Sequence, residues 1–199
     1  MTGLESESQA IMMSLPQTAA LVVIDVQEAF LDPGYGERNN LGAESNIAQL
    51  VAAWRRSGRP IRYIVHDSLE PNSPLRRESP GNAIQEGAAP ESGEPVYHKH
   101  VNSAFIGTDL EKDLRRDGIE TLVIVGLTTN HCVSTTARMA GNLGFETYVV
   151  SDATATFARR ALDGTLRSAE SVHAAALSDL HGEFATVLDT AAILQKTAP

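Results

Sequence analysis

The sequence predicts an α/β fold in which helices cover both faces of a mostly parallel β-sheet. Short apolar runs rich in Val, Ile and Leu, typical of strands buried on both faces, alternate with segments whose apolar residues recur at helical spacing. The clearest run covers residues 19–25 (AALVVID) and ends in the carboxylate of Asp25. The chain has 199 residues, 42% of them hydrophobic and 21% charged, which is the size and composition of one globular domain.

Six strands and five helices follow from this pattern. The strands are expected at residues 19–25, 61–65, 96–98, 121–125, 145–151 and 184–188. The helices are expected at residues 43–57, 108–117, 132–143, 165–180 and 189–196. Gly58, Gly118 and Gly144 each stand where a helix ends, a position that favours glycine. Strands that alternate with helices imply parallel pairing and a sheet wrapped on both faces.

Two segments do not fit this alternation. Residues 1–17 are polar and mixed, and we expect them to form a frayed N-terminus ahead of a single domain over residues 18–199. Residues 68–95 hold five of the nine prolines and three glycines. A long irregular segment in a compact domain is usually functional or disordered, so we expect a lid over the site or a contact with a neighbouring subunit.

Charge and composition exclude several classes of protein. Sixteen Lys and Arg against 25 Asp and Glu give a net charge of −9, which argues against nucleic-acid binding. No apolar run reaches about 18 residues, so no membrane-spanning helix is expected. The first 20 residues lack the Lys or Arg of a signal peptide, and a cytoplasmic protein is expected. The single cysteine, Cys132, excludes an intrachain disulfide and a four-thiolate zinc site.

Ligands of a doubly wound sheet bind beyond the carboxyl ends of its strands. The polar groups that follow the expected strands are Asp25, His66, Asp67, Lys99, the 126–132 loop and Asp152. Cys132 lies at or just before the first turn of a helix, where the helix dipole should lower the thiol pKa and favour a nucleophilic thiolate. Neighbouring N–H groups could also stabilise an oxyanion. The alternative is a buried cysteine that serves only as a small apolar residue.

Asp25 and Lys99 each have a chemical and a structural interpretation. Asp25 could accept the thiol proton and later give it to a leaving amine, or it could cap a turn. Strand alternation places Lys99 opposite His98 and His100. Beside Cys132, the charge of this lysine would favour the thiolate, whereas a lysine at the surface would simply be solvated.

The histidines do not predict a metal site. His98 and His100 could share a face near His66 and Asp67, but no HxxxH pair on a helix accompanies them. His131 is adjacent to the cysteine, and adjacent residues on a helix or turn point apart, which disfavours a cysteine–histidine dyad. The glycine-rich phosphate loops and the GxSxG serine elbow are also absent from the sequence. We expect no metal and no cofactor.

Three motifs occur in order at the expected strand ends. They are LVVIDVQ at residues 21–27 leading to Phe30, K-x-x-x-S-x-F from Lys99 to Phe105, and GLTTNHCV at residues 126–133. With these motifs the chain resembles the isochorismatase-like cysteine hydrolases, a family that includes nicotinamidases, N-carbamoylsarcosine amidohydrolases and streptothricin hydrolases. The resemblance implies a three-layer α/β/α, Rossmann-like fold with a six-stranded, mostly parallel sheet. It also implies assembly into homodimers or larger homo-oligomers.

The resemblance further implies the residues that carry the chemistry. Matched motif by motif, the catalytic triad is Asp25, Lys99 and Cys132. A cis peptide is implied between Leu127 and Thr128, and the N–H groups of Thr128 and Cys132 would form the oxyanion hole. Members of the family hydrolyse C–N bonds of small amides and carbamoyl compounds, so a small-molecule amide is the expected substrate.

Two departures from the family patterns narrow this expectation. The D-x-H metal element of nicotinamidases is incomplete here, because Asp67 is followed by Ser68 and Leu69. True isochorismatases, which cleave a vinyl ether, lack the nucleophilic cysteine that this chain has. Both departures favour a metal-free amidohydrolase.

The expected reaction is hydrolysis through a thioester on Cys132, with Asp25 as general base and acid and Lys99 as electrostatic support. The residues expected to bind substrate flank the triad and are Phe30, Asn102, Phe105, Asn130 and His131. One alternative is non-covalent hydrolysis of an ether or ester with Asp25 as general acid. Another is a non-enzymatic redox or ligand-binding module that uses Cys132, although no second cysteine exists to resolve a sulfenic acid.

Overall fold

The fold is built on one parallel sheet. The computed structural model describes residues 14–197, and within them six strands form a sheet of order β3-β2-β1-β4-β5-β8. Every neighbouring pair in this sheet is parallel. The strands are β1 (Ala20–Ile24), β2 (Ile61–His66), β3 (Val96–Lys99), β4 (Thr121–Leu127), β5 (Glu146–Ala155) and β8 (Thr186–Leu188). The expected α/β fold with a six-stranded sheet is confirmed.

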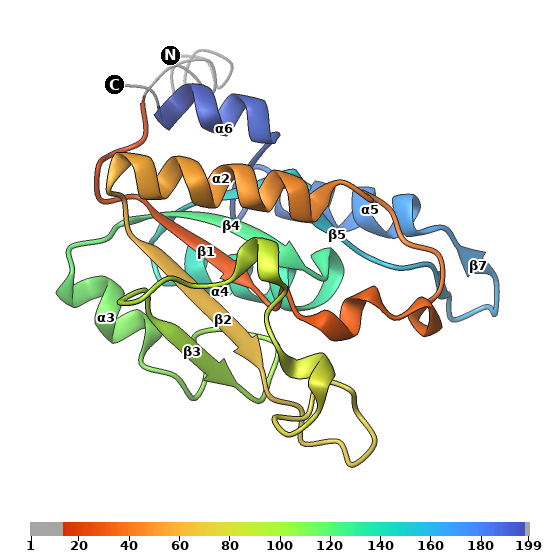
Figure 1. Ribbon diagram of the computed structural model, residues 1–199. Helices are drawn as coiled ribbons and strands as arrows, with labels where there is room; N and C mark the ends of the chain where they lie inside the picture. The colour runs from red at the N-terminus through yellow and green to blue at the C-terminus, as the bar shows by residue number, and fades with distance from the viewer. Residues whose placement is uncertain (1–13, 198–199) are drawn as a thin grey trace.

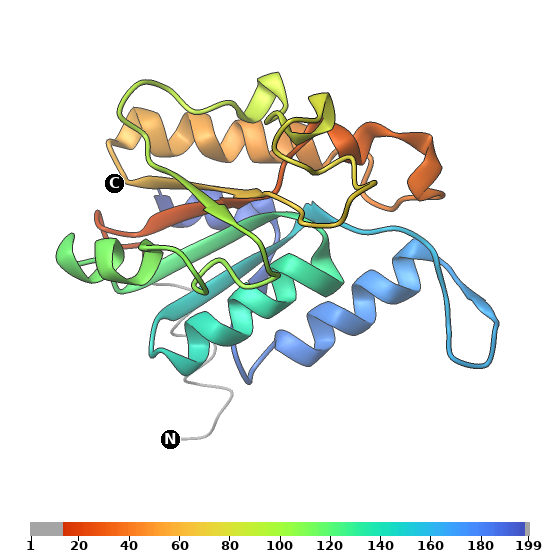
Figure 2. The same cartoon turned by 90° about the horizontal axis from the view of Figure 1, so that it is seen from below.

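Helices cover both faces of the sheet and give three layers (Figures 1 and 2). Helices α2 (Ala43–Ser57) and α6 (Thr190–Thr197) lie on one face. Helices α3 (Leu110–Arg116), α4 (Ser134–Asn142) and α5 (Ala169–Leu180) lie on the other. None of the helices in residues 14–197 combines the length and apolar character needed to cross a membrane.

Strand β1 is buried on both of its faces, which explains why its sequence is continuously apolar. Val22 and Ile24 pack into the core on the α3, α4 and α5 side, whereas Leu21 and Val23 pack into the core on the α2 and α6 side. Successive side chains of a strand point to opposite faces, and here both faces are covered. Each position of β1 therefore has to be apolar.

The order of the strands reverses at β1. Strands β2 and β3 continue the sheet on one side of β1, and β4, β5 and β8 continue it on the other. Ile24 pairs with Ile64 of β2 and with Gly126 of β4. Chains leaving the carboxyl ends of β1 and β4 diverge at such a reversal and open a crevice. Asp25 follows β1 at the centre of this edge.

Gly126 allows β4 to approach β1 at the same edge. Its φ angle is +117°, and a Cβ built on it would lie 1.9 Å from the carbonyl oxygen of Ile24. Because strain and overlap both oppose a side chain, we expect Gly126→Ala to lower the free energy of unfolding by about 3 kcal/mol. Urea unfolding followed by circular dichroism measures this. Gly87→Ala is the control, since nothing lies within 4 Å of its Cβ position; equal stability of the two variants would contradict the expectation.

Strand β5 is longer than expected and ends at Ala155 instead of residue 151. Asp152 therefore lies inside the strand, where its Oδ1 accepts hydrogen bonds from the N–H and hydroxyl of Thr190 at 2.8 and 2.7 Å. These bonds hold the first residue of α6. The sequence places Asp152 among the polar groups at the strand ends, where ligands bind. In the structure its carboxylate instead caps the start of α6.

Helix α5 begins at Ala169 and not at residue 165, because the Ser168 hydroxyl accepts a hydrogen bond from the Ser171 N–H and caps the helix. The residues before it form an antiparallel hairpin of β6 (Arg159–Arg160) and β7 (Leu166–Arg167), which was not expected. The hairpin projects from the body of the protein (Figure 2).

Segment 68–95 is held against the sheet by side-chain amides. Asn82 donates to the carbonyl oxygens of His66 and Leu75 at 3.0 and 2.9 Å. Gln27, just beyond β1, donates to the carbonyl oxygen of Asn82 at 2.9 Å, and Gln85 donates to that of Gln27 at 3.0 Å. The segment expected to form a lid or subunit contact is therefore anchored to the ends of β1 and β2.

The frayed terminus expected over residues 1–17 lies mostly outside the described residues, which begin at residue 14. Within residues 14–17, Leu15 packs against the domain. Leu15 is buried, its N–H donates to the carbonyl oxygen of Lys196 at 2.8 Å, and its own carbonyl accepts from Arg59 at 3.1 Å. The packed domain thus includes residues ahead of position 18.

Candidate active site

Lys99 is a buried lysine whose ammonium contacts three other side chains. As strand alternation predicts, its side chain points into the protein while that of His98 points out. Its Nζ lies 2.7 Å from Asp25 Oδ2, 3.3 Å from Cys132 Sγ and 3.1 Å from His66 Nδ1. An ammonium has three N–H donors, and each of them has an acceptor here.

The sheet register brings these groups to one face. His66 of β2 pairs with Lys99 of β3, and paired residues of parallel strands project to the same side. Ile64 and Tyr97, two residues earlier in the two strands, belong to the core that contains Cys132. His66 and Lys99 therefore project toward the cysteine.

Asp25 reaches the same point because it leaves the strand geometry of β1. Regular alternation would direct its side chain to the face opposite that of Ile24. Its φ angle is instead +49°, in the left-handed region that few residues other than glycine occupy. The carboxylate is buried and meets Lys99 on the side of the cysteine. Backbone strain of this kind concentrates at functional sites.

Cys132 lies in a π-helical turn, η5 (Thr129–Val133), that leads into α4. The Val133 N–H donates to the carbonyl oxygen of Thr128 at 3.3 Å, the i to i−5 spacing of a π-turn. The peptide between Leu127 and Thr128 is cis, as the resemblance implies. The helical segment thus starts before the cysteine, at Thr129.

Burial raises the pKa of the Cys132 thiol to about 12. The charge of Asp25 also raises this pKa, and the nearby ammonium of Lys99 opposes both effects without overcoming them. The expectation that a helix N-terminus lowers this pKa is therefore wrong, because burial and the adjacent carboxylate dominate. The resting group at neutral pH is a thiol, which needs a base before it can act as a nucleophile.

Asp25 is placed to be that base. Burial raises the pKa of its carboxyl, and the Lys99 ammonium opposes this increase. Oδ2 is bonded to Lys99, whereas the buried Oδ1 has no hydrogen-bond partner among the described residues. A carboxylate oxygen of Asp25 lies within 4.8 Å of Cys132 Sγ. The carboxylate is therefore close enough to the sulfur to accept the thiol proton, and Oδ1 is the oxygen without a competing partner.

Alkylation of the single cysteine should show the raised pKa directly. We expect iodoacetamide to modify native Cys132 more slowly at pH 7.5 than the urea-unfolded chain, with a rate that keeps rising above pH 9, because only the thiolate reacts. Asp25→Asn should shift this profile to lower pH, since the Asp25 charge raises the thiol pKa. Mass spectrometry of the intact protein measures the rates. A rate that levels off below pH 8 would contradict the expectation.

One group of described residues has the composition of a metal site: Asp25, His66 and Cys132, whose ligand atoms lie within 4.8 Å of one another. The Lys99 ammonium already contacts all three side chains, so a divalent ion could enter only by displacing it. The group therefore fits a lysine better than a metal.

His66 is a neutral acceptor in this cluster. Since an ammonium only donates, His66 Nδ1 accepts the hydrogen bond from Lys99 and the ring N–H is on Nε2. Burial and Lys99 lower the pKa of His66, which keeps it neutral.

A second set of histidines surrounds Asp67 at the ends of β2 and β3. His98 Nδ1 lies 3.0 Å from Asp67 Oδ2, and Asn82 donates to Oδ1 at 3.2 Å. His100 Nδ1 lies 2.7 Å from the Asp67 carbonyl oxygen. Both carboxylate oxygens of Asp67 thus have protein partners, and these contacts tie the two strand ends together.

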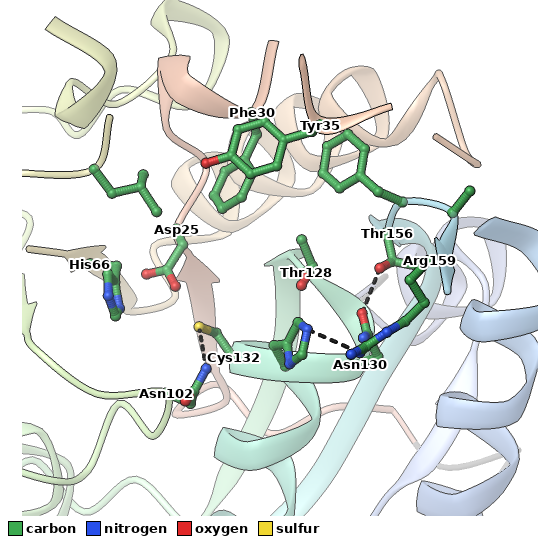
Figure 3. Close-up of a pocket in the computed structure, with 14 residues that line it drawn as sticks. Asp25, Phe30, Tyr35, His66, Asn102, Thr128, Asn130, Cys132, Thr156 and Arg159 are labelled. Atoms are coloured by element: carbon green, nitrogen blue, oxygen red, sulfur yellow. Dashed lines mark hydrogen bonds between the residues drawn. The ribbon is translucent and has the colours of Figure 1, made fainter. Parts of the chain in front are cut away.

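A pocket of about 410 Å³ opens beside the sulfur (Figure 3). One wall is aromatic, with ring centroids 5.3 Å apart for Phe30 and Tyr35 and 5.1 Å apart for Tyr35 and Phe157. The remaining lining residues are Asp25, His66, Leu75, Asn102, Thr128, Asn130, His131, Cys132, Thr156, Ala158 and Arg159. Asn102 also donates to Cys132 Sγ at 3.5 Å. Segment 68–95 reaches this pocket through Leu75.

The structure places four of the five residues expected to bind substrate in this pocket, namely Phe30, Asn102, Asn130 and His131. Phe105 is elsewhere. Its ring is buried in the core and stacks on Phe145 with centroids 5.9 Å apart. The expectation for Phe105 is wrong, because the last residue of its motif packs beneath the site and not in it.

Several lining residues were not identified from the sequence. Thr156, Phe157 and Arg159 follow the true end of β5, and Tyr35 lies in a short 3₁₀ turn after β1. The rule that ligands bind at strand ends would have selected the first three had β5 been extended to Ala155. Nothing in the sequence around Tyr35 distinguishes it from a surface tyrosine.

The fold and the site together define a three-layer α/β protein with a buried cysteine, carboxylate and lysine at the topological switch point of its sheet. Residues 19–192 match the isochorismatase domain model. The chain is 48% identical over 176 residues to the isochorismatase family protein YrdC of Bacillus subtilis, covering 88% of this chain and 94% of that protein. The chain belongs to the isochorismatase family, as the motifs predicted, and is a hydrolase of that family.

Two further proteins show the range of similarity. An isochorismatase-family protein from Chromobacterium violaceum has a crystal structure that matches with a TM-score of 0.91 at 43% identity, covering 94% of this chain and 96% of that one. Ureidoacrylate amidohydrolase RutB of Methylobacterium radiotolerans is 30% identical over 212 residues, covering 89% of this chain and 78% of that protein. The family therefore includes an enzyme named for amide hydrolysis.

Proposed function

We propose that this protein hydrolyses the C–N bond of a small amide or carbamoyl compound through a thioester on Cys132. The three-way contact at Lys99 carries the proposal: its Nζ lies 2.7 Å from the Asp25 carboxylate and 3.3 Å from the Cys132 sulfur, at the base of a pocket. A nucleophile, a base and a cation held together beside an open cavity are what covalent acyl transfer requires.

The first half of the reaction forms the thioester. The sulfur attacks the substrate carbonyl carbon while the thiol proton passes to Asp25, because a thiol with a pKa of about 12 does not ionise beforehand. The N–H groups of Thr128 and Cys132 hold the negative charge that develops on the carbonyl oxygen. Asp25 then gives the proton to the leaving nitrogen, the C–N bond breaks, and ammonia or an amine departs.

The second half regenerates the enzyme. Asp25, again ionised, takes a proton from a water molecule whose oxygen attacks the thioester carbonyl. The C–S bond breaks, the proton returns to the sulfur of Cys132, and a carboxylic or carbamic acid is released. Through both halves the Lys99 ammonium stabilises the Asp25 carboxylate and the sulfur whenever it carries negative charge. The amidohydrolase relative RutB supports this reaction class for the chain.

The test is ammonia release from a panel of primary amides, carbamoyl compounds and ureides, with vinyl ethers and esters included. We expect turnover of at least one C–N substrate, and a loss of about 1,000-fold or more in the Cys132→Ala protein. Cys132→Ser, which keeps the shape of the side chain, should be similarly impaired, since a hydroxyl is a weaker nucleophile. C–N hydrolysis that survives Cys132→Ala, or turnover of the ethers and esters alone, would overturn the proposal.

A further inference from the structure

The pocket lining contains one charged side chain that is paired and one that has no ion-pair partner. The Asp25 carboxylate at its base is paired with Lys99 at 2.7 Å. His66 and His131 also line the pocket, but burial lowers the pKa of both rings and leaves them neutral. Arg159 is the remaining charged residue of the lining, and no carboxylate lies within 4.0 Å of it among residues 14–197. The pocket therefore presents an uncompensated positive charge.

Arg159 is exposed and lies at the rim of the pocket. It begins β6 directly after Thr156, Phe157 and Ala158, which all line the pocket. Its Nη1 lies 3.3 Å from His131 Nε2, and since an arginine only donates, the neutral imidazole accepts. Figure 3 shows the Arg159 side chain at the edge of the pocket, near Thr156 and Asn130. One N–H of the guanidinium is used in this contact, and the others remain available to a ligand.

We propose that Arg159 binds a carboxylate of the substrate, so that the substrate is a small amide or carbamoyl compound that also carries a carboxylate. A planar guanidinium matches a carboxylate through paired, charge-assisted hydrogen bonds. The aromatic wall of Phe30, Tyr35 and Phe157 lies in the same pocket and suits a flat or apolar connection between the two ends of such a molecule. A phosphate dianion fits less well, because the lining offers a single guanidinium. This inference rests on the proposed amide hydrolysis.

The test compares pairs of probes that differ in charge. N-carbamoylglycine is paired with ethylurea, and succinamate with pentanamide, each pair having a C–N bond of one type with and without the carboxylate. We expect the wild-type protein to prefer the anionic member of each pair. Arg159→Gln should lower kcat/KM for the anionic probes by about 10- to 100-fold, mainly through KM, and leave the neutral probes nearly unchanged.

Arg160→Gln is the matched control. Arg160 is the next residue of the same hairpin, but it donates to the carbonyl oxygen of Gly164 and does not line the active-site pocket. We expect its substitution to leave both members of each pair unchanged. Equal losses in the Arg159→Gln and Arg160→Gln proteins, or equal losses for anionic and neutral probes, would overturn the carboxylate assignment.

Binding to the Cys132→Ala protein separates this inference from the proposed reaction. We expect calorimetric titration with succinamate to show binding that Arg159→Gln weakens by at least 10-fold in the same background. Such binding without any hydrolysis by the wild-type protein would refute the proposed function alone. Hydrolysis of the neutral probes, with no charge preference and no effect of Arg159→Gln, would refute the carboxylate assignment alone.

Discussion

Replacing Asp25 by Asn is expected to lower kcat for amide hydrolysis about 10,000-fold, the upper end of what a general acid–base group contributes. The loss should be this large because Asp25 acts in both halves of the reaction. It accepts the proton of a thiol whose pKa is about 12, and it later deprotonates the attacking water. An amide of the same shape fills the space but accepts no proton. Steady-state ammonia release measures the change.

The Asp25→Asn protein also separates ionisation of the thiol from catalysis. Because the Asp25 charge raises the thiol pKa, this variant should contain more thiolate at neutral pH and react faster with iodoacetamide while turning over far less substrate. Asp67→Asn is the control, since that carboxylate lies at a neighbouring strand end but contacts His98 and Asn82 and not the sulfur. An Asp25→Asn protein within tenfold of wild-type activity would remove Asp25 from the mechanism.

Lys99→Met is expected to lower both activity and stability. Methionine matches the apolar stem of lysine but leaves Asp25 buried without its partner, which should cost about 3 kcal/mol of unfolding free energy at neutral pH. Turnover should fall about 100-fold or more, because the cation that stabilises the carboxylate and sulfur is lost. Lys99 also lowers the pKa of Asp25, so its removal raises that pKa and should move the acid limb of kcat/KM to higher pH.

A double variant distinguishes these two effects of Lys99. In Lys99→Met/Asp25→Asn no unpaired charge remains, so we expect urea unfolding to recover most of the lost stability. Activity should remain at the level of the Asp25→Asn single variant or below. If the double variant recovered turnover together with stability, the role of Lys99 would be to stabilise the fold and not to assist catalysis.

The sequence was most informative where burial is complete. Helix α2 was predicted at its observed bounds, because Ile47, Leu50 and Trp54 mark its buried stripe and Gly58 adopts the left-handed conformation that ends it. The orientation of Lys99 also followed from alternation within β3. Local periodicity determines such features, so one sequence is enough to predict them.

Features that depend on long-range contacts were missed. The end of β5 was misplaced because Asp152, which looks like a strand-end carboxylate, is satisfied by Thr190 far along the chain. The thiol pKa was predicted in the wrong direction, since the depth of Cys132 and its distance from Asp25 are set by packing and not by neighbours in sequence. The hairpin carrying Arg159 has no periodic apolar pattern, so its part in the pocket could be seen only in three dimensions.

The thioester can be sought directly on the protein. The enzyme is mixed with saturating amide, quenched in acid during steady-state turnover, digested and analysed by mass spectrometry, with hydroxylamine added to a parallel reaction. We expect the peptide containing Cys132 to carry the mass of the substrate less ammonia, and the parallel reaction to yield the acyl hydroxamate. Sustained hydrolysis with an unmodified Cys132 peptide and no hydroxamate would contradict covalent catalysis by this cysteine.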